Sequence, residues 1–179
     1  MPEPTPIRHA TPADAAALAA FAAEVFPLGC PVTAPEDLAA HIAAELTPAR
    51  FAELIADPNT IALLAEGGGP ERCILGYMIA SRRNPHPAID APNAAEFRKL
   101  YLHPTMHGTG LSSALFHCAL SILNVEGPRP IWLSVFSGNQ RAIAFYKKWG
   151  FEIAGEQIYQ VGSDPQRDFL MLRRPNQLP

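Results

Sequence analysis

Cysteine is scarce in this chain of 179 residues. Cys30, Cys73 and Cys118 are odd in number and far apart, so they match neither the paired spacing of a zinc site nor a disulfide framework. Thiols that lack a disulfide partner are usual in the reducing environment of the cytoplasm. The cysteines therefore predict reduced thiols, no metal site and a cytoplasmic protein.

Charge is scarce too, and neither sign dominates. Charged residues make up 17% of the chain, and the formal net charge is −3 at pH 7. Proteins that bind nucleic acid usually carry a basic surface, so we expect no nucleic acid as a partner and at most a local phosphate site. No uncharged apolar run is long enough to span a membrane, and the alanine-rich start, interrupted by Asp14 and Glu24, does not resemble a signal peptide. We therefore expect no membrane partner.

Hydrophobic residues make up 48% of the chain, a composition typical of a folded globular protein. We expect a single domain over residues 1–179, with a proline-rich loop over 84–95 inside it. Polar residues before proline mark three helix starts, with Thr11, Thr33 or Ala34, and Thr47 as the capping residues.

Apolar periodicity and turn residues predict the remaining elements. The expected helices cover residues 12–26, 35–46, 48–57, 110–127 and 140–150. The expected strands cover residues 5–9, 60–66, 73–83, 97–104, 130–136, 151–162 and 167–174, with hairpins at 67–72 and after 162. This order predicts a mixed α/β sheet with helices on its faces.

An unusual sequence, HGTG at residues 107–110, joins the fourth strand of this series to a helix. One glycine is enough for most turns, so two glycines around Thr109 indicate that a ligand approaches the backbone. The amides from about Gly108 to Ser113 are free at a helix start, where the helix dipole favours an anion. Thr109, Ser112 and Ser113 can add hydroxyl donors. The alternative is a glycine turn without a ligand.

Two nucleotide motifs are excluded at this junction. No lysine follows the second glycine, so the loop is not a P-loop, and the third glycine of a dinucleotide fingerprint is missing.

Two segments together resemble the central motifs of the GNAT superfamily of acyl-CoA-dependent N-acetyltransferases. They are LYLHPTMHGTGLSSALF at 100–116 and WLSVFSGNQRAIAFYKKWGF at 132–151. The resemblance implies the acyl-CoA N-acyltransferase fold, with a mixed, mostly antiparallel central sheet of six to seven strands and helices on both faces. It also implies acetyl-CoA as the cofactor, an amine-bearing small molecule or peptide as the substrate, and a homodimer as a common assembly.

The family's phosphate-binding loop is Gln or Arg, two residues, Gly, one residue, then Gly or Ala. It falls on the run His107, Gly108, Thr109, Gly110, Leu111 and Ser112, with Ser113 next. His107 replaces a fixed cation or amide with a group that is mostly neutral at pH 7, which predicts weaker or pH-dependent cofactor binding. Ser112 is small, so this departure should be tolerated.

The resemblance implies further cofactor contacts and an acid. The family's asparagine, here Asn139, contacts the pantetheine arm, and its tyrosine, here Tyr146, lies near the thioester sulfur, where a phenol can protonate the departing thiolate. The backbone of Tyr101 and Leu102 pairs with pantetheine, which requires this strand to diverge from the strand over 130–136. The alternatives are a helix cap for Asn139 and a buried core aromatic for Tyr146.

A base must remove a proton from the acceptor ammonium. Glu96 is the first candidate, because several family members carry a catalytic glutamate at the start of this strand; His103 and a water chain are the others. Direct attack of the amine is expected, since no cysteine has a visible activating partner. The alternative function is a catalytically silent acyl-CoA-binding or sensor domain.

Overall fold

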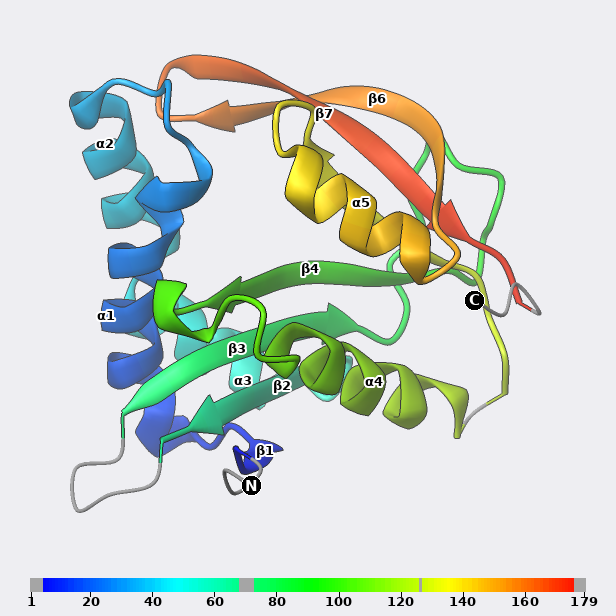
Figure 1. Cartoon of the computed structure of the whole chain (residues 1–179), viewed down its shortest axis with the longest axis horizontal. Helices are drawn as coiled ribbons and strands as arrows, with labels where there is room; N and C mark the ends of the chain where they lie inside the picture. The colour runs from blue at the N-terminus through cyan, green and yellow to red at the C-terminus, as the bar shows by residue number, and fades with distance from the viewer. Residues whose placement is uncertain (1–4, 68–72, 126, 176–179) are drawn as a thin grey trace.

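A seven-stranded sheet forms the centre of the computed structural model, which describes residues 5–67, 73–125 and 127–175. The strands lie in the order β1, β2, β3, β4, β5, β7, β6 (Figure 1). Only β4 and β5 pair in parallel; the other neighbours are antiparallel. The strands are β1 Ile7–His9, β2 Thr60–Glu66, β3 Ile74–Ser81, β4 Ala95–Leu102, β5 Ile131–Phe136, β6 Glu152–Val161 and β7 Asp164–Arg173. The predicted mixed, mostly antiparallel sheet is confirmed.

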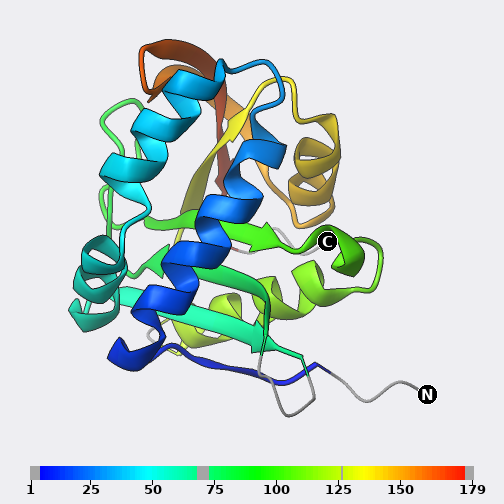
Figure 2. The same cartoon turned by 90° about the vertical axis from the view of Figure 1, so that its left-hand side faces the viewer.

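Helices cover both faces of the sheet (Figures 1 and 2). One face carries α1, α2 and α3, and the other carries α4 and α5. The helices are α1 Ala15–Val25, α2 Pro35–Glu45, α3 Pro48–Ala56, α4 Leu111–Asn124 and α5 Gln140–Lys148. Within the described ranges, no helix combines the length and the hydrophobicity that crossing a bilayer requires.

The predicted helix starts are close to the observed ones, and their caps explain why. The Thr47 hydroxyl accepts a hydrogen bond from the amide of Arg50 at 3.2 Å, and the Asn139 side chain accepts one from the amide of Ala142 at 3.1 Å. The first helix differs, because residues 12–14 form a 3-10 turn before α1 begins.

Two strands begin earlier than predicted. β7 starts at Asp164 and so includes Pro165, which the sequence pattern leaves in a turn. At this end β7 pairs only with β6. The backbone N–H that proline lacks is therefore not needed for a hydrogen bond to β5. β4 starts at Ala95, where it meets β5. The predicted 67–72 turn lies outside the described residues from position 68 onward.

Each face of the sheet has its own hydrophobic core. Phe116 of α4 packs edge to face on Phe97 at 4.7 Å between ring centroids, and also contacts Trp149 and Phe151. On the opposite face, Tyr77 of β3 is surrounded by side chains of α1 and α3. The sheet is therefore buried on both sides around β3 and β4, which holds these strands in place.

The loop over 84–94 covers the start of β5. Its residues Ile89, Ala91 and Ala94 pack on Trp132, whose indole N–H donates to the Asn84 carbonyl at 2.5 Å. This loop holds the first residues of β4 in position.

A β-bulge interrupts the pairing of β3 with β4. Ile79 faces Lys99 and Ala80 faces Phe97, which leaves Arg98 without an opposite residue. A bulge shifts the side-chain alternation by one position. Phe97 therefore belongs to the core under α4, whereas Tyr101 belongs to the core under α1.

The parallel pair at the centre of the sheet is short. β4 and β5 are paired only from Ala95 to Phe97 and from Ile131 to Leu133, and beyond these residues the two strands no longer pair. The sheet is opened at its middle, between Leu100–Leu102 on one side and Val135–Phe136 on the other.

Candidate active site

A cavity of about 220 Å³ lies where β4 and β5 diverge. The chain brings four residues to its wall that the sequence singled out from distant positions: Glu96, Tyr101, Asn139 and Tyr146. Glu96 and Tyr101 lie near the two ends of β4, Asn139 caps the start of α5, and Tyr146 lies in its second half.

Tyr146 presents a protonated phenol to this cavity. Its ring packs against Phe145 and Phe151, and burial raises the pKa of its hydroxyl to about 12. A phenol with such a pKa keeps its proton at neutral pH and can offer it to an anion that develops beside it.

Asn139 lies at the start of α5, below the same opening. Its side-chain oxygen caps the helix by accepting from Ala142, and its amide nitrogen has no hydrogen-bond partner among the described residues. Capping uses the oxygen and leaves two N–H donors, so the residue can serve both roles that the sequence left open.

Glu96 lies at the narrow end of the cavity, and 14% of its side chain is exposed. Its carboxylate accepts a hydrogen bond from Asn84 Nδ2 at 2.6 Å and lies 3.7 Å from the Arg98 guanidinium. Burial outweighs these two contacts and raises the pKa of Glu96 above its ordinary value. A carboxylate of raised pKa is a better proton acceptor than an exposed one.

The glycine loop has the backbone of an anion site. Gly108 and Gly110 have φ values of 80° and 90°, where residues with a side chain are strained. Among the described residues, the amides of Gly108, Gly110, Ser112 and Ser113 have no hydrogen-bond partner. A Cβ at either glycine would meet no atom within 4 Å, so the space in front of the loop is open.

Thr109 has a different role from the hydroxyl donor that its position suggested. Its hydroxyl donates to the Met106 carbonyl at 2.8 Å and accepts from the Leu111 amide at 3.4 Å. The hydroxyl proton therefore holds the turn. Leu111 is buried in the core, so it can offer only its backbone.

Arg141, which no motif singled out, lies against His107. Its Nη1 is 3.0 Å from His107 Nδ1 and its Nη2 is 3.3 Å from Nε2. A neutral imidazole has one acceptor nitrogen, so one of the two contacts is a hydrogen bond from the guanidinium. Burial and the Arg141 charge lower the pKa of His107, which keeps the ring neutral at pH 7. The loop thus has a fixed cation beside it, from α5 instead of position 107.

Three further cavity residues come from other parts of the chain. Cys30, which the sequence separates from both motifs, lines the cavity, and burial raises the pKa of its thiol to about 11. Ser134 donates to the buried carboxylate of Asp168 at 2.5 Å.

His103, the second candidate base, is absent from the described lining of the cavity. Its Nδ1 lies 2.7 Å from the Thr105 hydroxyl in the turn after β4, and its Nε2 lies 3.8 Å from Glu24. The ring belongs to the turn that leads into the glycine loop.

The chain also matches a known protein family. The family model of the acetyltransferase (GNAT) family matches residues 28–151, which include the glycine loop, both motifs and most of the residues that line the cavity. The chain belongs to the GNAT family. The resemblance of the two motifs to this family is thereby confirmed.

Relatives of this GNAT chain are named as N-acetyltransferases. An uncharacterized N-acetyltransferase of Mycobacterium tuberculosis is 40% identical over 161 residues, which cover 89% of this chain and 97% of the relative. An uncharacterized N-acetyltransferase of Lactobacillus delbrueckii is 26% identical over 137 residues, which cover 76% of this chain and 78% of the relative.

Solved GNAT structures share the fold at low sequence identity. PaiA N-acetyltransferase from Thermoplasma acidophilum, in complex with coenzyme A, has a TM-score of 0.74 at 20% identity and covers 96% of this chain and 99% of its own. NAA60 from Arabidopsis thaliana, in complex with acetyl-CoA, has a TM-score of 0.72 at 14% identity and covers 96% and 98%.

We expect the contact between Arg141 and His107 to be visible in the protonation of the ring. In an NMR titration, His107 should protonate below the ordinary histidine pKa of about 6.5, because burial and the guanidinium disfavour the imidazolium. Arg141→Gln should move this titration to higher pH. Lys148→Gln, which removes a charge from the last turn of the same helix, should leave it unchanged. An identical His107 titration in Arg141→Gln would contradict the contact.

Proposed function

We propose that this GNAT acetyltransferase transfers the acetyl group of acetyl-CoA directly to a primary amine. One observation carries the proposal: the opening between β4 and β5 holds a protonated phenol and a carboxyl of raised pKa, and it lies beside a loop of unpartnered amides. CoA complexes of GNAT proteins with the same fold support the choice of the cosubstrate.

The pyrophosphate would be held at the start of α4. The free amides of Gly108, Gly110, Ser112 and Ser113 converge there at the positive end of the helix dipole. Arg141 adds a full positive charge and compensates for the neutral His107. The departure at position 107 therefore does not exclude tight binding.

The pantetheine arm would lie along β4 past the point where β5 leaves it. The backbone of Tyr101 and Leu102 faces the opening on this side, since β5 pairs no further than Leu133. Backbone groups without a partner strand can bind an extended amide chain as a sheet binds another strand. Asn139 offers its free N–H donors at the other wall.

In the reaction, the C–N bond to the acceptor forms and the C–S bond of the thioester breaks. Glu96, directly or through a water molecule, accepts the proton that the acceptor ammonium must lose, and Tyr146 donates a proton to the departing thiolate. Cys30 lines the same cavity, but its raised pKa keeps the thiol protonated, which supports direct attack over a cysteine intermediate.

The glycine loop can be tested by binding alone. We expect Gly110→Asp to weaken acetyl-CoA binding at least 100-fold in a calorimetric titration, because a carboxylate facing the pyrophosphate costs about 3 kcal/mol or more. Gly127→Asp is the matched control: Gly127 also has a positive φ, of 102°, and lies after the other end of α4. Equal affinities of the two variants would contradict a phosphate site at Gly110.

The acid can be tested by separating turnover from binding. We expect Tyr146→Phe to lower kcat by about 10² or more, measured as CoA release with an amine found in a panel of small amines, while acetyl-CoA affinity changes less than threefold. Tyr77→Phe, which removes the hydroxyl of a fully buried core tyrosine, should leave kcat unchanged. An unchanged kcat in Tyr146→Phe would assign the acid elsewhere. Acetyl-CoA binding with no turnover in the unaltered protein would favour the silent acyl-CoA-binding domain.

The base can be tested through the pH profile. The protonated Glu96 carboxyl cannot accept a proton, so kcat/KM should rise with pH through a pKa above the ordinary glutamate value of about 4.3. Glu96→Gln should remove this rise of kcat/KM with pH, the acidic limb of the profile, and most of the activity. Asn84→Ala should move the limb to higher pH, because the Asn84 hydrogen bond lowers the Glu96 pKa. A limb that is the same in Asn84→Ala and survives in Glu96→Gln would assign the base to another group.

A further inference from the structure

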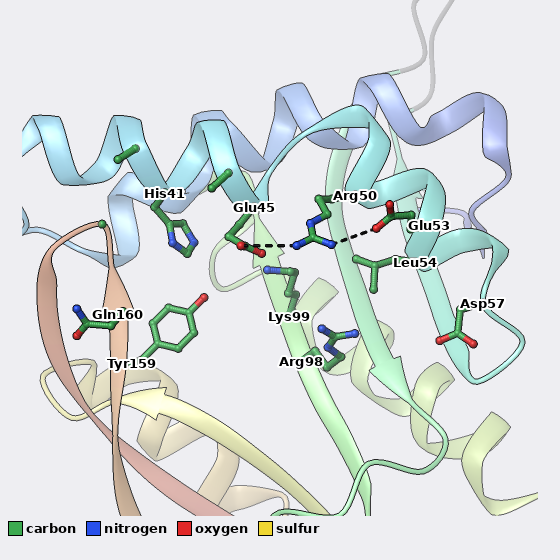
Figure 3. A pocket seen from close by; sticks show the side chains of 13 residues that line it. His41, Glu45, Arg50, Glu53, Leu54, Asp57, Arg98, Lys99, Tyr159 and Gln160 are labelled. Atoms are coloured by element: carbon green, nitrogen blue, oxygen red, sulfur yellow. Dashed lines mark hydrogen bonds and ion pairs between the residues drawn. The ribbon is translucent and has the colours of Figure 1, made fainter.

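A second and larger cavity, of about 1060 Å³, opens on the face of the sheet that carries α2 and α3 (Figure 3). It is lined from α2, α3, β4 and β6, and it shares Arg98, Lys99 and Tyr159 with the cavity where β4 and β5 diverge. The β-bulge at Arg98 turns Lys99 toward this face. A molecule bound here would reach the proposed acetyl-transfer site past these three side chains, so the inference below rests on the proposed function.

Most charged side chains around this second cavity already have an ion-pair or hydrogen-bond partner. Arg50 pairs with Glu53 at 3.2 Å and lies 4.0 Å from Glu45. Asp57 accepts hydrogen bonds from the Asn59 amide at 2.9 Å and from the Thr60 hydroxyl at 3.0 Å.

Lys99 is different, because its ammonium has neither a hydrogen bond nor an ion pair within the described part of the chain. The side chain is half-buried on β4, and its amine end points into the cavity from below Glu45 (Figure 3). Burial and the Arg98 charge lower the pKa of Lys99, as expected for a cation without a full counter-charge. A half-buried cation gains stability from a bound anion.

Two neutral polar groups accompany Lys99, one of which, the His41 imidazole, donates from Nε2 in one of its two tautomers. His41 of α2 is 5% exposed, its Nε2 is buried without a partner, and burial lowers the pKa of its ring, so it is neutral at pH 7. Burial also raises the pKa of Tyr159 to about 12, which keeps its hydroxyl a donor. Figure 3 shows Tyr159 and Lys99 pointing toward one another, with His41 above them. The three side chains come from three elements and share one cavity.

We propose that the acceptor of this acetyltransferase is an amino carboxylate, whose carboxylate is held by Lys99, Tyr159 and His41 while its amine points to the opening between β4 and β5. One ammonium and two neutral donors match the single charge of a carboxylate. The cavity is large enough for a substrate with several groups besides the amine and the carboxylate.

Binding of a carboxylate that cannot react tests the site without any turnover. Pentanoate and pentylammonium are titrated into the full chain saturated with CoA. We expect pentanoate to bind more tightly than pentylammonium, and Lys99→Met to weaken pentanoate at least tenfold. Lys99→Arg, which keeps the charge, should retain binding within about threefold, and Tyr159→Phe should weaken it a few-fold. Lys148→Met, the same change on the exposed end of α5, should have no effect.

Turnover adds the second half of the test. With 5-aminopentanoate and pentylamine as acceptors, kcat/KM should favour the carboxylate at least tenfold in the unaltered enzyme, and Lys99→Met should remove this preference mainly through KM. Tighter binding of pentylammonium, or equal pentanoate binding in Lys99→Met, would overturn the amino carboxylate proposal.

The two proposals fail in different ways. If pentylamine or another amine without a carboxylate is the better substrate, the result supports the acetyltransferase proposal and contradicts the carboxylate site. If acetyl-CoA is never turned over and pentanoate still binds through Lys99, the carboxylate site stands and the acetyltransferase proposal falls.

Discussion

The early end of pairing between β4 and β5 is the constraint on which the site depends. Three residues of each strand pair, and from there the strands are held apart by different partners. β4 stays on β3 and between the two cores, while β5 stays on β7. Backbone groups that leave a sheet in this way need another partner, because an unsatisfied buried amide or carbonyl is costly. The fold therefore leaves backbone groups at its centre that the proposed cosubstrate can pair with.

Burial acts on the groups around this opening in one consistent direction. It raises the pKa of the Glu96 and Asp168 carboxyls, of the Tyr146 phenol and of the Cys30 thiol, because each is less stable as an anion there. The carboxyl becomes a stronger base, the phenol remains a donor, and the thiol loses reactivity. A single environment thus favours general acid and base chemistry over covalent catalysis.

Local signals predicted the elements well. Proline at the first helical position marks the starts of α2 and α3, and Asn139 before α5 is both visible in the sequence and present as a cap. Such signals act within one helical turn, so they can be recognised in the sequence without knowledge of the tertiary structure. The 3-10 turn before α1 and the position of Pro165 inside β7 depend on pairing and packing, and these were missed.

The site was predictable only where a motif was continuous. The glycine loop, Asn139 and Tyr146 lie in two short segments, whereas Arg141 acquires its importance from a contact with His107 across 34 positions. Asp168 reaches the cavity because β7 pairs with β5, and Cys30 reaches it from the connection between α1 and α2. Both positions depend on the tertiary structure.

The bulge at Arg98 has a consequence for how the length of β4 can vary. Arg98 is the extra residue of the bulge, so removing it would restore regular pairing and leave every later side chain on its present face. If the bulge were made regular with all residues kept, Lys99 and Tyr101 would turn into the apolar core under α4, and Leu100 and Leu102 would turn out of it. Insertions and deletions are usually tolerated in loops and rarely in strands. In β4, Arg98 is a position where a deletion would leave the surfaces that the two substrates are proposed to use unchanged.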